Sequence, residues 1–214
     1  MIEYLIGRAR TYEQWKNWGY VSLFVENVPQ DTNVTTHCFC SKKDSTVFID
    51  WGDNKIVKYI ISTSSTVVSH TYDTLFSGEI RIYGNFLSSY GAYNNTSLYP
   101  YIKKVSGFSN TLKSITLGSI QRCKVEIVNI SGFPNLSTLY VDRCDNLKEI
   151  IGLSGTTRAI KICAGSGKMT QDFDLANITM PSSTSFISLK TTGHVKVPVW
   201  INRTWDYDKS HTNT

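Results

Sequence analysis

The sequence predicts a mostly β protein in two parts, a β-sandwich followed by a short solenoid of stacked repeats. The aromatic content is high, with 12 Tyr, 9 Phe and 5 Trp among 214 residues. Ser, Thr and Asn are plentiful and acidic helix formers are few, which favours strands over helices. In the first half, β-branched and aromatic runs alternate with turn residues roughly every 8–12 residues, a spacing typical of a sandwich. After residue 105 one apolar pattern recurs, which indicates stacked units.

Residues 1–19 are predicted to form an N-terminal arm that carries Trp15 and Trp18. Its apolar residues favour an ordered arm, because a chain terminus stays ordered only when something holds it. The arm either packs on its own sandwich or grips a neighbouring subunit, and packing on its own sandwich is the simpler arrangement. Both tryptophans are candidate partner contacts under the second alternative.

The sandwich is predicted over residues 20–90 and is centred on the stretch 46–84. Short strands are expected at 20–25, 34–40, 47–49, 56–61, 66–72 and 80–82. The segment Asp50-Trp51-Gly52-Asp53-Asn54 has the residues of a tight turn between two strands. Each aspartate is expected to accept hydrogen bonds from its own turn backbone, and His70 is expected to bond to this turn.

Three features of this half follow one another in order: I-D-W-G-D, then H-T-Y at residues 70–72, then S-G-E-I-R-I-Y-G. They resemble the PKD-type immunoglobulin-like β-sandwich, in which a strand ends in a W-G-D-G or F-G-D-G turn and a later strand carries H-T-Y. The resemblance covers residues 20–84 and assigns structural roles to Asp50, Trp51, Gly52, Asp53, His70 and Tyr72. Asn54 stands where that family usually has Gly, and Asn tolerates a left-handed backbone. The resemblance implies a spacer or binding module.

Residues 91–104 are predicted to be a loop-rich connector that contains the domain boundary. Tyr90, Tyr93 and Tyr99 stand in or beside it on a polar Gly, Asn and Ser background, which is the chemistry of adaptable binding loops. These tyrosines are therefore candidate partner contacts. The alternative is a simple linker whose tyrosines cover the first repeat of the next domain.

Residues 105–195 are predicted to form the repeats. The segment Leu136-x-x-Leu139-x-Val141-x-x-Cys144-x-x-Leu147 follows the leucine-rich-repeat template. Partial copies stand at 112–117, 160–162 and 187–189. Each unit is expected to supply one short strand, and the units must stack because none can bury its apolar face alone. The region resembles the irregular BspA-like leucine-rich repeats, which implies a buried structural role for Cys144. Sandwich-plus-repeat proteins of this kind are familiar from Bacteroides-type bacteria and their phages.

The last segment, 196–214, is predicted to cap the open end of the solenoid and continue as a tail. Trp205 and Tyr207 are further candidate partner contacts, with packing inside the cap as the alternative.

No pattern predicts an enzyme, a cofactor or a metal site. The segment 164–169 lacks the first Gly and the Ser or Thr of a phosphate-binding loop. Cys38 and Cys40 share one strand face, without the second ligand pair that zinc requires. Two aspartates around a Trp-Gly turn are too few for calcium. The five cysteines have no pairing pattern and are expected to be reduced, as in a cytosol.

The remaining features favour protein partners. The net charge is +5, but Lys and Arg are scattered, so neither nucleic acid nor a membrane is the expected partner. The N-terminus lacks the apolar core of a secretory signal, so export by the standard route is not expected. These features predict a non-enzymatic auxiliary or decoration protein of a tailed-phage capsid, located in virions assembled in the host cytoplasm. The alternative is a bacterial surface adhesin or glycan-binding module, located at the cell surface.

Overall fold

The computed structural model describes Trp15 and residues 17–62, 66–91, 96–118, 122–141, 143–164, 168–179, 187–189, 191–196 and 198. Among these residues the elements are strands and a single 3-10 turn, which confirms the mostly β prediction. The strands of the first half are β1 (Tyr20–Val28), β2 (Asn33–Cys40), β3 (Ser45–Asp50), β4 (Ile56–Ile61), β5 (Thr66–Thr71), β6 (Phe76–Tyr83) and β7 (Leu87–Tyr90). The turn η1 (Tyr99–Tyr101) then leads into β8 (Ile102–Phe108).

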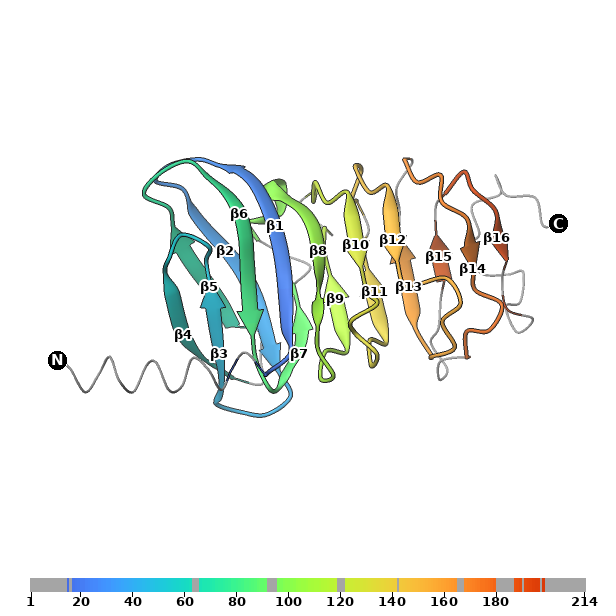
Figure 1. Ribbon diagram of the computed structural model, residues 1–214, viewed down its shortest axis with the longest axis horizontal. Helices are drawn as coiled ribbons and strands as arrows, with labels where there is room; N and C mark the ends of the chain where they lie inside the picture. The colour runs from blue at the N-terminus through green and yellow to red at the C-terminus, as the bar shows by residue number, and fades with distance from the viewer. Residues whose placement is uncertain are drawn as a thin grey trace.

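The second half contains shorter strands. They are β9 (Ser114–Thr116), β10 (Ile127–Asn129), β11 (Thr138–Tyr140), β12 (Glu149–Ile151), β13 (Lys161–Ala164), β14 (Phe173–Asp174), β15 (Ile187–Leu189) and β16 (Val195–Lys196). In Figure 1 these strands stand side by side along the long axis of the molecule. They form a solenoid-like stack.

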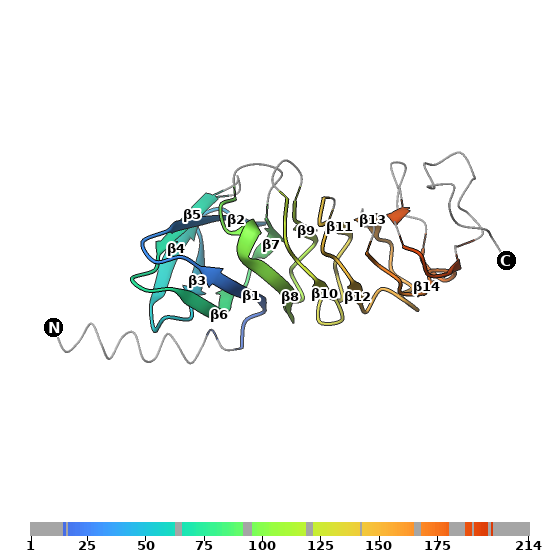
Figure 2. The ribbon, with the colours of Figure 1, turned by 90° about the horizontal axis from the view of Figure 1, so that it is seen from above.

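Two seven-stranded sheets run through both halves. Sheet A has the order β12-β10-β8-β1-β6-β3-β4, and sheet B has the order β15-β13-β11-β9-β7-β2-β5. Figure 2 shows them as two layers. Pairing is antiparallel among β1–β7, and it changes to parallel where β8 meets β10 and where β7 meets β9. We call residues 20–108 the antiparallel half and the residues after 108 the parallel half.

The expected connector and repeat boundaries do not separate these halves. The predicted connector ends at residue 104, but β8 begins at Ile102, and the predicted start of the repeats at residue 105 lies inside the same strand. β8 is antiparallel to β1 on one side and parallel to β10 on the other. The halves are therefore joined by shared sheets and not only by a linker.

Burial follows the period of two that a strand dictates. In β2 the buried positions alternate through Val34, Thr36, Cys38 and Cys40, so the two cysteines share the inner face as predicted. The three-residue strands β9 to β12 each bury their middle residue. The residues from both halves form one continuous apolar core.

Each coil of the parallel half supplies two strands, not one. β9, β11 and β13 lie in sheet B, while β10 and β12 return through sheet A. The repeat template places one strand in each unit, so it did not include β10 and β12, which bury their middle residues Val128 and Ile150. Beyond β12, the side-chain amide of Gln171 hydrogen-bonds both the N–H and the C=O of Ile150. This side chain takes the place of a neighbouring strand before the small β14–β16 sheet.

Candidate partner-binding surfaces

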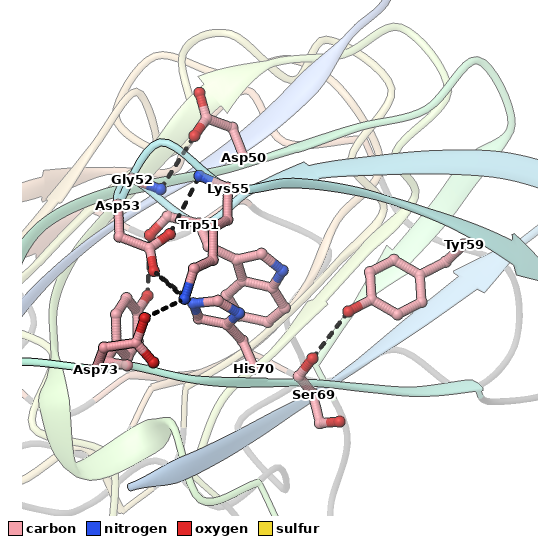
Figure 3. Close-up of polar contacts among 10 residues, drawn as sticks. Asp50, Trp51, Gly52, Asp53, Lys55, Tyr59, Ser69, His70 and Asp73 are labelled. Atoms are coloured by element: carbon pink, nitrogen blue, oxygen red, sulfur yellow. Dashed lines mark hydrogen bonds and ion pairs between the residues drawn. The ribbon is translucent and has the colours of Figure 1, made fainter. Parts of the chain in front are cut away.

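The turn between β3 and β4 has the geometry that its sequence predicts (Figure 3). Gly52 and Asn54 both have a left-handed backbone, with φ of 83° and 66°. Asp50 accepts a hydrogen bond from the N–H of Gly52 at 3.0 Å, and Asp53 accepts one from the N–H of Lys55 at 3.3 Å. The aspartates therefore stabilise their own turn, and Asn54 adopts the left-handed backbone expected of it.

Residues of β5 and the segment after it complete this turn. The imidazole Nε2 of His70 lies 2.8 Å from Asp53 Oδ2, and its ring stacks on the buried indole of Trp51 with ring centroids 4.9 Å apart. The Tyr72 hydroxyl donates to the carbonyl of Trp51 at 2.9 Å. We call Asp50, Trp51, Asp53, His70 and Tyr72 the turn cluster. Because β3 and β4 belong to sheet A and β5 to sheet B, the turn cluster ties the two sheets together.

The electrostatics of the turn cluster fit this structural role. Burial raises the pKa of Tyr72 strongly, so the phenol stays protonated and keeps donating. Lys55 lies 2.7 Å from Asp73 and 3.6 Å from Asp53, and these carboxylates raise its pKa. The Tyr72 phenol, the Lys55 ammonium and the carboxylates of Asp53 and Asp73 all make internal contacts, which is the arrangement of a fold-stabilising cluster.

Two of the predicted contact tyrosines are core residues. Tyr90 and Tyr99 are 0% and 1% exposed. The Tyr90 hydroxyl accepts a hydrogen bond from Thr36, and the Tyr99 hydroxyl donates to the carbonyl of Thr116. This burial leaves neither ring available to a partner, so the contact prediction is wrong for both. Tyr99 instead follows the alternative, because it covers the start of the parallel half. Tyr93, Trp205 and Tyr207 lie outside the described residues.

The two arm tryptophans contact the outer face of sheet A. Trp15 is buried and stacks on Phe48 of β3, while Trp18 is half-buried against the same ring at 6.2 Å. Tyr83 belongs to the same cluster, and Tyr20 packs against it. At these two residues the arm therefore packs on its own antiparallel half. Trp15 is not available to a partner, whereas part of Trp18 is.

Exposed aromatic side chains continue across the outer face of sheet A. Phe24 is 40% exposed on β1, and Phe108 is 51% exposed on β8 opposite Tyr20. Charged residues stand beside them, because Phe24 lies between Glu79 on β6 and Lys104 on β8. We call Phe24, Glu79, Lys104 and Phe108 the sheet A face. The sequence contains a signal for it, since the alternation that buries Leu23 and Val25 turns Phe24 outward.

The side chains that match the repeat template lie inside the parallel half. Leu136, Leu139, Val141 and Cys144 are all 0% exposed. The Cys144 thiol lies 3.9 Å from the carbonyl of Leu117 in the preceding coil, within the range of a weak S–H hydrogen bond. These residues therefore hold neighbouring coils together and are not on the surface.

A charged row also links the coils on the outside. The Glu126 carboxylate lies 2.6 Å from Lys148 and 3.2 Å from Lys103, one residue on each neighbouring coil. The hydrogen bonds from Lys148 and Lys103 lower the pKa of Glu126. Exposed pairs of this kind contribute little energy, but they favour one alignment of the coils.

The five cysteines form no disulfide. Burial raises the pKa of Cys40 to about 11, and burial together with the neighbouring Cys40 raises that of Cys38 further. The folded protein therefore keeps both thiols protonated at pH values where the unfolded chain ionises. Their contribution to stability is complete below pH 9 and is lost as the pH rises through the folded-state values.

We expect the free energy of unfolding to fall by about 1–3 kcal/mol between pH 8 and pH 10 because of these two thiols. Urea denaturation at both pH values measures this loss. The double variant C38A/C40A should lose less stability over the same interval. An equal loss in the variant would contradict the thiol assignment.

None of the described residues forms a helix with the length and hydropathy of a membrane span. Comparison of the chain with family models, with curated proteins and with solved structures finds no match.

Proposed function

We propose that this chain is a non-enzymatic auxiliary or decoration protein of the capsid of a tailed bacteriophage, and that it acts by binding other virion subunits. The observation that supports the proposal is the sheet A face. Exposed apolar patches rimmed by polar residues mark interaction sites, and Phe24 and Phe108 stand among charged residues on one face of sheet A, as in protein interfaces.

The fold assignment behind this proposal is a PKD-like sandwich joined to irregular leucine-rich repeats. The turn cluster supports the first part, because His70 and Tyr72 bond to the turn that carries Trp51. The buried template residues of the 136–147 unit support the second part. Both families consist of interaction modules, and the two sheets shared by the halves suit a subunit that must hold its shape within an assembly.

The same face favours a second candidate, a glycan-binding module of a bacterial surface adhesin. Sugars are bound by aromatic rings with polar groups at their rim, and Glu79 and Lys104 flank Phe24 in this way. In that case the chain would work as a monomer or a small oligomer, whereas the capsid proposal places it in a large particle.

Density-gradient sedimentation of the native protein from its source distinguishes these candidates. We expect the 24.1 kDa chain to travel with particles far heavier than itself and to remain there at high salt. The variants F24S and F108S should shift toward the top of the gradient, because they remove the apolar part of the sheet A face. L75S is the matched control, since Leu75 is 66% exposed but lies outside sheet A.

Sedimentation of the wild-type chain near the top of the gradient would contradict the capsid proposal. Binding to a glycan array that depends on Phe24 and Phe108 would then support the second candidate. Equal particle binding by wild type, F24S and F108S would show that the sheet A face is not the contact.

A further inference from the structure

Within the part of the chain that the structure describes, no strand pairs with the outer side of β4 at the edge of sheet A. β4 is the last strand of sheet A, and β3 is its neighbour. The N–H of Trp51 donates to the carbonyl of Lys55, which fixes the alternation of the β3–β4 ladder. In an antiparallel pair, every second residue bonds to the neighbour and the others point away. Ile56, Lys58 and Ile60 therefore direct their N–H and C=O groups away from β3.

The same three residues carry exposed side chains. Ile56 is 37% and Ile60 is 53% exposed, and Lys58 between them is exposed as well. Lys58 forms no ion pair with any other described residue. The edge of β4 thus presents three pairs of backbone groups together with an apolar–basic–apolar row of side chains.

The matching edge of sheet B is partly closed. β5 is the last strand of that sheet, and the alternation set by β2 turns Val67 and Ser69 away from β2. The carbonyl of Ser69 already accepts a hydrogen bond from the Tyr59 hydroxyl at 2.8 Å. Tyr59 of β4 therefore occupies one acceptor on the β5 edge, which makes β4 the more open of the two edges of the antiparallel half.

We propose that β4 binds an extended segment of a partner protein as an additional antiparallel strand, and that this segment carries an acidic residue opposite Lys58 between two apolar residues. Backbone hydrogen bonds to the edge strand give an added strand its affinity. Contacts of alternate side chains give it specificity. Opposite charges on directly paired residues stabilise a sheet, and like charges destabilise it. This proposal deepens the proposed role as a protein-binding subunit and rests on it.

Lys58 also argues against a second copy of this chain as the occupant. Symmetric antiparallel pairing of two β4 strands places Lys58 directly opposite Lys58 of the other copy. If the register shifts by two residues, the two lysines become diagonal neighbours, and their like charges are still within reach of each other. A lysine in the middle of an edge strand opposes such self-association. An acidic residue on a partner strand would instead be attracted to the same lysine.

The test uses the full chain and two synthetic peptides, T-I-T-E-T-I-T and T-I-T-K-T-I-T. We expect the Glu peptide to bind about tenfold more tightly than the Lys peptide, in line with the size of charge effects between paired strand residues. Amide hydrogen exchange at Ile56, Lys58 and Ile60 should slow when the Glu peptide binds, because these N–H groups become hydrogen-bonded. K58E should reverse the preference between the peptides.

Proline variants separate edge pairing from binding to the face of the sheet. K58P removes an N–H that points away from β3, so the β3–β4 ladder keeps its bonds while the edge is blocked. Peptide binding should be lost in K58P and kept in V67P, which makes the same change on the β5 edge. Urea denaturation checks that both variants fold, and K58E tests the proposal with an intact backbone if K58P does not fold.

Equal binding of the two peptides, or no slowing of exchange at the three amides, would overturn the proposal. A wild-type homodimer in analytical ultracentrifugation that K58P abolishes would overturn it in favour of self-pairing. If the chain sediments with particles but binds neither peptide, the strand proposal fails and the capsid proposal stands. If it binds the Glu peptide but never sediments with particles, the capsid proposal fails and the strand proposal stands.

Discussion

Replacing Trp51 with alanine lowers the free energy of unfolding by about 3–5 kcal/mol, the usual cost of removing a large buried aromatic side chain. The Trp51 indole is fully buried, and His70 stacks on it. The loss therefore leaves a cavity where the β3–β4 turn meets β5. Urea denaturation, followed by far-UV circular dichroism, measures the effect.

Tyr72→Phe is the matched control. It keeps the aromatic ring and removes only the hydroxyl that donates to the Trp51 carbonyl. Leaving a buried acceptor without its donor costs about 1–3 kcal/mol, less than the cavity. If W51A destabilised the protein no more than Y72F, the indole would not be the centre of the turn cluster.

The turn cluster could be predicted because its information is local. Gly52 and Asn54 determine a left-handed turn by residue type, and two aspartates within that turn have their own backbone as the nearest donor. The contact between His70 and Asp53 joins residues 17 positions apart, and it was expected from the H-T-Y element that the chain shares with PKD-type sandwiches by resemblance. Alternation in β2 likewise placed Cys38 and Cys40 on one face.

The contact surfaces could not be predicted in the same way, because they depend on pairing between distant strands. Tyr90 and Tyr99 stand in a polar, loop-like sequence, but the pairing of β7 with β9 closes the core over both rings. The open edge at β4 is known only once the order of strands in sheet A is known. Residue type alone cannot distinguish an exposed tyrosine that could bind a partner from one that is buried in the fold.

Ending the chain after residue 104 should abolish cooperative folding of the antiparallel half, although the repeats are expected to begin only at residue 105. The cut removes the last four residues of β8, including Val105 opposite Leu23 and Phe108 opposite Tyr20, and leaves only Ile102 and Lys104 paired with β1. It also removes β9, which pairs with β7. The fragment 1–104 would expose apolar surface on both sheets at once. Differential scanning calorimetry should show no cooperative transition for it.

The fragment 1–164 is the control for this truncation. It keeps β8 and the strands from β9 to β13, so both sheets continue past the antiparallel half. We expect it to unfold in one cooperative transition, at a lower temperature than the full chain because the last coils no longer cover its end. Because the halves share both sheets, L139A in the parallel half of the full chain should lower the temperature of the same single transition that W51A lowers. Two separate transitions, each moved by only one of these variants, would mean that the halves fold as independent domains despite their common sheets.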